Sequence, residues 1–176
     1  MEKIFYADKS AYSTSEEAVQ QLLSRHFGIN NAIITRNENG KPFLHVSRDS
    51  KLFFSISHTK DYLFITFSQN NIGIDAESLT RNIDYLPIIK KFHIDEQITI
   101  KSQKDFLYHW TAKESTIKWL GGSIAKDLKN LIFIDNQMKY KGISLPVFFH
   151  FQEFNGHIIT LCSENRIKNI QFQSIL

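Results

Sequence analysis

The hydrophobic positions of this chain follow two different periods. From Thr14 to Gly28 and from Ser102 to Gly121 they recur every three or four residues, which predicts two amphipathic helices that end at glycines. Residues 83–92 and 95–101 are predicted as shorter helices. Short apolar runs, several of them alternating, predict strands in much of the remaining chain. These are residues 3–7, 33–35, 52–57, 62–67, 72–77, 131–133, 147–151, 157–162 and 169–172. Residues 43–77 as a whole are predicted to be a meander of strands.

The order of these elements indicates the α+β class. After Leu79 the pattern changes from strand to helix, and it returns to strand near Leu131, so two strand-rich portions flank a helical centre. The sequence contains no long linker or low-complexity segment. At 176 residues it is long enough to bury a substantial core, and we expect one compact unit.

Composition excludes several kinds of protein. The formal net charge of +3 suits a surface that meets phosphates or acidic partners, but it is too small to indicate a nucleic-acid-binding protein. The single cysteine, Cys162, excludes an internal disulfide and a multi-cysteine zinc site. No apolar run approaches the roughly 20 residues of a membrane span, and the N-terminus lacks a secretory signal, so we expect a cytoplasmic protein. The Walker A, GxGxxG and GxSxG motifs are missing, which excludes P-loop NTPases, classical dinucleotide enzymes and serine hydrolases.

One face of the predicted helix 102–121 carries a carboxylate within an apolar stripe. The stripe consists of Leu107, Trp110, Glu114 and Ile117. A buried or half-buried acid requires a cation, a hydrogen-bond partner or a shifted pKa. Two ordinary roles stay open for Glu114: a capping box with Thr111, although the helix is already running there, and a helical ion pair with Lys118.

A second acidic group lies on the predicted strand 72–77. Asp75 and Glu77 share one strand face with only Gly73 beside them. Side chains two residues apart in a strand are about 7 Å apart, and from there both can converge on a hard cation such as magnesium. Glu114 can complete this set from the helix. The alternative is a solvated strand face with acids that lead into a turn.

Two further places have side chains suited to phosphate. His58 follows Ser55 and Ser57 at a predicted strand end, where it can donate hydrogen bonds to phosphate oxygens, although the pattern also fits an ordinary strand-end histidine. No acid is placed behind His58, so no Ser-His-Asp triad is inferred. Lys41 lies in the turn Asn37–Pro42, where a lysine can bind phosphate as a point charge or be simply solvated.

Four motifs carry these residues, and their order is more specific than any one of them. They are Gly40-Lys-Pro42, Phe54-Ser-Ile-Ser-His58, Gly73-Ile-Asp-Ala-Glu77 and Trp110-Thr-Ala-Lys-Glu-Ser-Thr-Ile-Lys118. Together they resemble the 4′-phosphopantetheinyl transferases of the Sfp type, over about residues 13–145. Phe92-His-Ile-Asp-Glu96 is similar to a further segment of that family, between the last two motifs.

The resemblance implies an enzyme of the holo-[acyl-carrier-protein] synthase type. It implies a magnesium-dependent transfer of the 4′-phosphopantetheine arm from coenzyme A to a serine of an acyl, polyketide or peptidyl carrier protein, with release of adenosine 3′,5′-bisphosphate. The magnesium ligands implied are Asp75, Glu77 and Glu114. The catalytic residues implied are Glu114, Lys118 and His58. Coenzyme A would be bound by Gly40, Lys41, Pro42, Ser57, His58 and Lys118.

Each residue also takes an implied role from the resemblance. Glu114, or a water that it holds, would take the proton of the attacking serine. Lys118 would neutralise the leaving phosphate, and His58 would bind the pyrophosphate. Lys41 and Ser57 would hold the 3′-phosphate side, while the residues that flank Lys41 in its motif would shape the nucleotide pocket.

The family fold implies two similar α+β halves, here 1–79 and 80–176, that form a pseudo-dimer with the active site between them. We expect a monomer whose partners are coenzyme A and a carrier protein, with neither nucleic acid nor membrane. The basic N-terminal segment that many relatives use on the 3′-phosphate is mostly missing, which leaves those contacts unassigned. The carrier would meet residues 119–145, where the lysines fit an acidic partner or are simply solvated. These are Lys126, Lys129, Lys139 and Lys141.

The resemblance leaves a second role open. A degenerate relative would bind carrier proteins without modifying them. The three intact acids argue against that alternative, because a protein that only binds carriers has no need for them.

Overall fold

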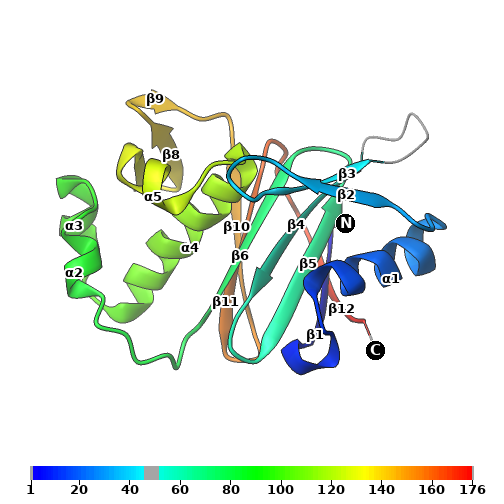
Figure 1. Ribbon diagram of the computed structural model, residues 1–176. Helices are drawn as coiled ribbons and strands as arrows, with labels where there is room; N and C mark the ends of the chain where they lie inside the picture. The colour runs from blue at the N-terminus through cyan, green and yellow to red at the C-terminus, as the bar shows by residue number, and fades with distance from the viewer. Residues whose placement is uncertain (1, 46–51, 176) are drawn as a thin grey trace.

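The computed structural model describes residues 2–45 and 52–175, and it arranges them as a helix, two sheets and a second helix, one layer on another (Figure 1). Residues 46–51, part of the region predicted as a strand meander, lie outside the described residues. The first sheet has the strand order β12-β1-β5-β4 and the second has the order β10-β11-β6. The mixed architecture confirms the α+β prediction.

The first sheet and α1 form one pair of layers. The elements are β1 (Glu2–Asp8), α1 (Ser15–Phe27), β4 (Phe53–His58), β5 (Tyr62–Ser68) and β12 (Ile170–Ser174). As predicted, Thr14 begins α1 by accepting a hydrogen bond from the backbone N–H of Glu17. Gly28 ends the helix with a φ of 64°. The apolar side chains of α1 pack on this sheet: Ala18, Val19, Leu22 and Leu23 are buried, and Phe27 on the last turn contacts Phe67 of β5 although it is 41% exposed.

The second sheet and α4 form the other pair of layers. The elements are β6 (Ile72–Ser78), α4 (Gln103–Leu120), β10 (Phe148–Phe154) and β11 (His157–Ser163). The predicted ends of α4 are confirmed: Ser102 accepts from the N–H of Asp105, and Gly121 has a φ of 71°. Because α4 already runs through Thr111, the capping box considered for Glu114 is excluded.

Smaller elements surround these layers. They are the hairpin β2 (Ile33–Arg36) and β3 (Pro42–His45), the helices α2 (Leu86–Ile89), α3 (Ile94–Thr99) and α5 (Ile124–Asp127), and the sheet β7 (Leu131–Ile134), β8 (Gln137–Tyr140) and β9 (Ile143–Ser144). Single 3₁₀ turns occupy Lys9–Ala11 and Leu128–Asn130. The helices α2 and α3 are shorter than predicted. β3 falls at the start of the predicted strand meander but was not predicted as a separate strand, and β8 and β9 were not predicted. In the part of the chain that the structure describes, no helix is both long and apolar enough to cross a membrane.

Two strands lie in sheets that the sequence does not suggest. β6 belongs to the second sheet, where it pairs with β11, and β12 belongs to the first sheet, where it runs parallel to β1. The predicted boundary at residue 79 therefore does not separate the two sheets. Between the sheets lies a shared core of Ile4, Phe64, Ile72, Ile74, Ala76, Ile159 and Leu161. The site described below lies where β4, β6 and α4 meet.

The burial of α4 is wider than the predicted stripe. Glu114 and Trp110 are only partly buried, while several polar side chains of the helix are fully buried. These are Thr111, Lys113, Ser115 and Thr116. The reason is that α4 has neighbours on two sides, with the second sheet on one and α3 and β7 on the other (Figure 1).

Candidate active site

The acids of β6 face α4, as the alternation along the strand predicted. Gly73 permits this arrangement, because a Cβ atom there would lie 1.9 Å from the backbone oxygen of Ser115. A side chain at this position would therefore force α4 away from β6. The close approach brings Glu114 near enough to Asp75 and Glu77 that both acids act on its pKa. The three predicted acids are thus brought together.

The carboxylate of Asp75 is held by two donors. Lys118 Nζ donates to Asp75 Oδ1 at 2.7 Å, and Ser57 Oγ donates to the same oxygen at 3.0 Å. Asp75 Oδ2 is buried and has no hydrogen-bond partner among the described residues. The ion pair considered between Glu114 and Lys118 is not found among the described residues, where Lys118 pairs with Asp75 instead.

Burial and the charge of Asp75 both act on the pKa values of Glu114 and Glu77. Burial, followed by the charge of Asp75, raises the pKa of Glu114 to about 8, although the ammonium of Lys118 acts in the opposite direction. Burial and the charge of Asp75 also raise the pKa of Glu77, against the opposing effect of its 2.9 Å ion pair with Arg81. The raised pKa favours the protonated form of Glu114 near neutral pH.

The donor set fits a hard divalent cation. Carboxylate oxygens are the ligands that magnesium prefers, and Asp75 Oδ2 is a buried acceptor that lacks a donor. As they stand, the described residues contain no group of three or more His, Cys, Asp and Glu side chains arranged around a common metal position. The ammonium of Lys118 supplies the positive charge next to Asp75 in this arrangement.

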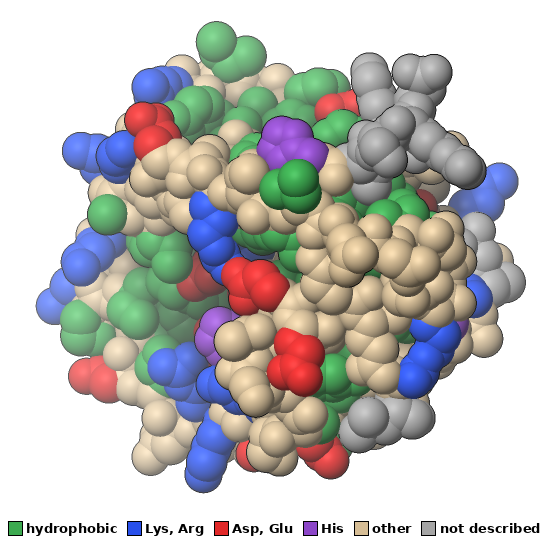
Figure 2. Space-filling model, turned by 45° about the vertical axis from the view of Figure 1, so that its right-hand side comes forward, with side chains coloured by type: hydrophobic (Ala, Val, Ile, Leu, Met, Phe, Trp, Pro, Cys, Tyr) green, Lys and Arg blue, Asp and Glu red, His purple; other side chains and the backbone are tan. Residues whose placement is uncertain are grey.

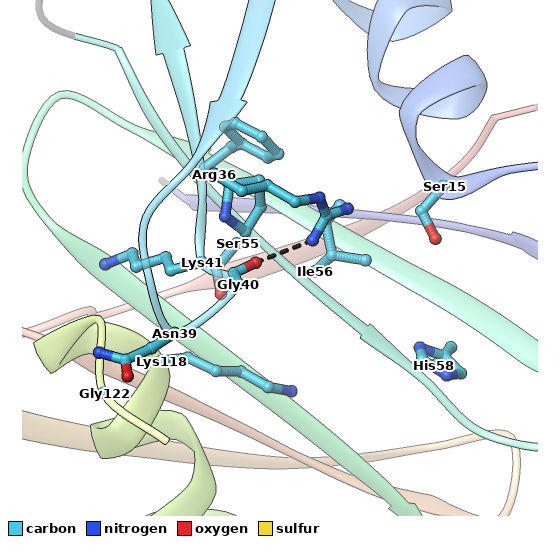
Figure 3. Close-up of a pocket in the computed structure, with 12 residues that line it drawn as sticks. Ser15, Arg36, Asn39, Gly40, Lys41, Ser55, Ile56, His58, Lys118 and Gly122 are labelled. Atoms are coloured by element: carbon cyan, nitrogen blue, oxygen red, sulfur yellow. Dashed lines mark hydrogen bonds between the residues drawn. The ribbon is translucent and has the colours of Figure 1, made fainter.

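A pocket of about 270 Å³ opens beside these acids, and twelve residues line it (Figure 3). Five of the six residues predicted to bind coenzyme A are among them: Gly40, Lys41, Pro42, His58 and Lys118. The sixth, Ser57, is not among the residues that line this pocket, and its hydroxyl contacts Asp75 and the backbone N–H of Ala76. In the space-filling view, acidic, basic and histidine side chains gather around a hollow on this side of the molecule (Figure 2).

Arg36 and Ser15 are pocket residues that the sequence analysis missed. Arg36 extends from β2 across the pocket, donates to the backbone oxygen of Gly40 at 2.8 Å and pairs with Glu16 at the start of α1 (Figure 3). Ser15 lines the same side of the pocket. A hairpin arginine four residues before a GKP turn was a signal in the sequence, but no local pattern indicated that α1 and β2 would meet there.

His58 lies between this pocket and a second one of about 590 Å³, and it lines both. The second pocket also contains Lys9, Lys60 and Arg81. Burial, together with the positive charges of Lys9 and Lys118, lowers the pKa of His58. The ring is therefore predominantly neutral at neutral pH, and it can donate one hydrogen bond and accept another.

Lys41 has partners that tie the β2–β3 turn to the end of α4. Its ammonium donates to Asn71 Oδ1 at 2.9 Å and to the backbone oxygen of Trp119 at 3.0 Å. Burial lowers the pKa of Lys41 to about 8. The side chains of Asn37 and Asn39 also connect the turn to the end of α4, because both donate to the backbone oxygen of Gly121. Lys41 thus has a structural role in addition to its place in the pocket wall.

Behind Glu114, a buried ion pair anchors α4 on its other side. Lys113 Nζ donates to Glu96 Oε2 at 2.9 Å and also to the backbone oxygen of Leu131, and neither charged side chain is exposed. Glu96 also accepts from the backbone N–H of Phe133 at 3.1 Å. Although burial alone would raise the pKa of Glu96, hydrogen bonds from His109 and the charge of Lys113 lower it. The sequence analysis gave Lys113 no role of its own.

Comparison with known proteins agrees with this arrangement. The profile of the 4′-phosphopantetheinyl transferase superfamily matches residues 71–162, which include β6, α4 and β11. The chain belongs to this superfamily. Its relatives include the 4′-phosphopantetheinyl transferase gsp of Aneurinibacillus migulanus, 31% identical over 144 residues, and Sfp of Bacillus subtilis, 29% identical over 153 residues. The recognition of an Sfp-type 4′-phosphopantetheinyl transferase from four motifs is confirmed.

These relatives are longer than this superfamily member. The match covers 76% of the chain and 59% of gsp, and 81% of the chain and 66% of Sfp. A putative 4′-phosphopantetheinyl transferase of Synechocystis, slr0495, is 28% identical over a match that covers 76% of the chain and 58% of that relative. The chain therefore spans about three fifths of the length of the curated relatives it matches.

Proposed function

We propose that the chain transfers the 4′-phosphopantetheine arm of coenzyme A to a serine of an acyl, polyketide or peptidyl carrier protein. The observation that carries this proposal is the convergence of Asp75, Glu77 and Glu114 next to a pocket lined by cationic side chains. Transfer of a phosphoryl-type group depends mainly on positioning and on neutralising charge, which such an arrangement can supply.

The residues present can hold magnesium and move the proton. Asp75, Glu77 and Glu114 would ligate the ion, which when bound supplies charge neutralisation and a template for the pyrophosphate. Glu114, or a water that it holds, would accept the proton of the carrier serine, because a base works best with a pKa near the working pH. Lys118 would turn from Asp75 to the leaving phosphate, and His58 would donate a hydrogen bond to the pyrophosphate.

For the nucleotide, we place the 3′-phosphate near Arg36. Its guanidinium lies in the pocket opposite Lys118 and His58, and a guanidinium can bind phosphate through two donors (Figure 3). Arg36 would supply the contact to the 3′-phosphate that the sequence left unassigned. The roles of Lys41 and Ser57 on the 3′-phosphate side stay predictions. Arg36→Ala should raise KM for coenzyme A more than KM for 3′-dephospho-coenzyme A, and equal effects on both would contradict the placement.

For the carrier protein, we propose contacts around α5 and the β8–β9 sheet. The lysines predicted to contact the carrier lie in the same segment of the chain as the exposed apolar side chains of Ile124 and Ile143. Such a combination suits an acidic partner with an apolar helix face. Lys126 reaches the pocket wall, since it donates to Asn39 Oδ1 at 3.1 Å. The same proposal includes four further points. The reaction releases adenosine 3′,5′-bisphosphate, the protein is a monomer in the cytoplasm, and the halves 1–79 and 80–176 form a pseudo-dimer.

Mass spectrometry on a panel of apo fatty-acid, polyketide and nonribosomal-peptide carriers tests the proposed function. We expect a gain of one phosphopantetheine that requires coenzyme A and magnesium. Glu114→Gln and Asp75→Asn should each abolish the gain while unfolding remains cooperative. Full activity in both variants would exclude these assignments. Coenzyme A binding without modification of any carrier would favour the degenerate relative that only binds carriers.

A further inference from the structure

The strands β4 and β6 lie beside each other but belong to different sheets, and serine hydroxyls join them. Ser55 Oγ accepts from the backbone N–H of Ile74 at 3.0 Å, and Ser57 Oγ accepts from the backbone N–H of Ala76 at 3.1 Å. Both serines are only 4% exposed. Each hydroxyl therefore takes the place of the backbone carbonyl that would satisfy this N–H in a continuous sheet.

Ser57 makes one contact that Ser55 does not make. The backbone N–H of Ala76 uses only a lone pair of the Ser57 hydroxyl, so the hydroxyl can still act as a donor. It donates to Asp75 Oδ1 at 3.0 Å. The hydroxyl is thus fixed by the backbone of β6 and in turn fixes a side chain of the same strand. Among the described residues, Lys118 and Ser57 both donate to Oδ1, which leaves Oδ2 as a buried oxygen that only the proton of Glu114 or a cation can meet.

We propose that Ser57 is a positioning residue for the metal ligand Asp75: its hydroxyl holds the carboxylate in the rotation that keeps Oδ2 available to a divalent cation. The inference rests on the proposed function for the presence of that cation. It replaces the predicted part of Ser57 on the 3′-phosphate side with a role on the metal side of the site, because the hydroxyl contacts Asp75 and the backbone of β6. Residues that orient a ligand typically affect metal affinity by about 10- to 100-fold when they are replaced.

Ser57→Ala and Ser55→Ala form a matched pair for the test. Each removes one hydroxyl from the same strand and leaves one backbone N–H of β6 without its acceptor, so both should lower the unfolding midpoint to a similar extent. Only Ser57→Ala also removes a donor to Asp75. Binding of Mn²⁺, followed by electron paramagnetic resonance and by calorimetry, is measured for the folded wild type and variants, with and without coenzyme A.

We expect Ser57→Ala to weaken Mn²⁺ binding by about 10-fold or more, Ser55→Ala to keep the wild-type affinity, and Ser57→Thr, which retains a hydroxyl, to recover part of the loss. In turnover, Ser57→Ala should raise the magnesium concentration for half-maximal rate and leave KM for coenzyme A near its wild-type value. Equal losses of Mn²⁺ affinity in the two alanine variants would reduce Ser57 to a structural role and overturn the proposal.

The remaining outcomes separate the two proposals. A higher KM for coenzyme A with unchanged Mn²⁺ affinity would assign the hydroxyl to the 3′-phosphate and also overturn the inference. Failure of the wild type to bind Mn²⁺, both alone and with coenzyme A, overturns it as well. If wild type binds Mn²⁺ and Ser57→Ala weakens that binding, but no carrier is modified, the positioning role stands and the proposed transferase function fails.

Discussion

Replacing Gly73 with alanine should push α4 away from β6 and separate the acids that meet across this contact. The added Cβ atom would lie 1.9 Å from the backbone oxygen of Ser115 and 2.8 Å from the backbone nitrogen of Trp119. Both distances fall below the 3.0 Å under which such contacts essentially never occur. Because the atoms it meets belong to the helix backbone, no side-chain rotation relieves the clash.

The size of the effect follows from the cost of overpacking. Extra atoms in a filled core typically cost about 1–3 kcal/mol, and more where the backbone has to move, so we expect a loss of about 3 kcal/mol or more in the free energy of unfolding. Gly156→Ala is the control. An added Cβ there meets nothing within 4 Å, although its φ of +73° is left-handed. That strain should limit the loss to about 1–2 kcal/mol.

Urea unfolding followed by tryptophan fluorescence suits this comparison. Both tryptophans of the chain, Trp110 and Trp119, lie on α4, so the signal reports on the helix that has to move. Mn²⁺ affinity of the folded protein supplies a second reading, and it should fall in Gly73→Ala and not in Gly156→Ala. If Gly73→Ala loses no more stability than its control, the close approach of α4 to β6 is refuted.

Three further predictions concern Lys118, Glu96 and Cys162. Lys118→Gln removes the ammonium that competes with a cation for Asp75, so Mn²⁺ titrations without coenzyme A should give tighter binding, while transfer to a carrier is lost. Unchanged or weaker Mn²⁺ binding would contradict this competition. Glu96→Gln should cost about 3–5 kcal/mol at pH 7, because it leaves the buried Lys113 unpaired. The pKa of Glu96 is lowered in the folded protein, so the stabilisation that Glu96 contributes is present above its unfolded pKa and is lost as pH falls through its folded pKa. The free energy of unfolding of Glu96→Gln should therefore depend less on pH in the acid range than that of the wild type. Burial raises the pKa of Cys162 to about 12, so the native thiol should not react with Ellman's reagent at pH 8 but should react fully in urea, and rapid native labelling would refute its burial.

The sequence allowed the main helices and the acidic strand to be predicted because their signals are local. Thr14 and Ser102 cap the N-termini through their own hydroxyls, and Gly28 and Gly121 end the helices through backbone angles that few other residues adopt. The alternation along β6 placed its acids on one face for an equally local reason. Motif order then indicated the family before any distance was known.

What could not be predicted depends on neighbours distant in sequence. Lys113 has a charged side chain, and only the packing of α3 and β7 on its side of the helix explains its burial. The partner of Lys118 was missed because helical spacing indicates Glu114, whereas β6 brings Asp75 closer. Arg36 was missed because the pocket wall combines β2 with the start of α1.

The exchange of strands between the layers has a consequence for the order in which the protein assembles. Glu2 pairs with Ile170, so the first sheet lacks its edge strand until nearly the whole chain has left the ribosome. β6 likewise cannot pair until β11 has been synthesised, since Asp75 lies opposite Thr160 in the register of the two strands. Contacts between residues so distant in sequence close slowly, and the fragments 1–79 and 80–176 would each expose an unpaired strand edge to aggregation. The fragment 1–79 keeps the strands β1, β5 and β4, and the fragment 80–176 keeps β10 and β11. The strand β6 and the helix α4 fall in different fragments, so Asp75 and Glu77 can meet Glu114 only in the joined chain.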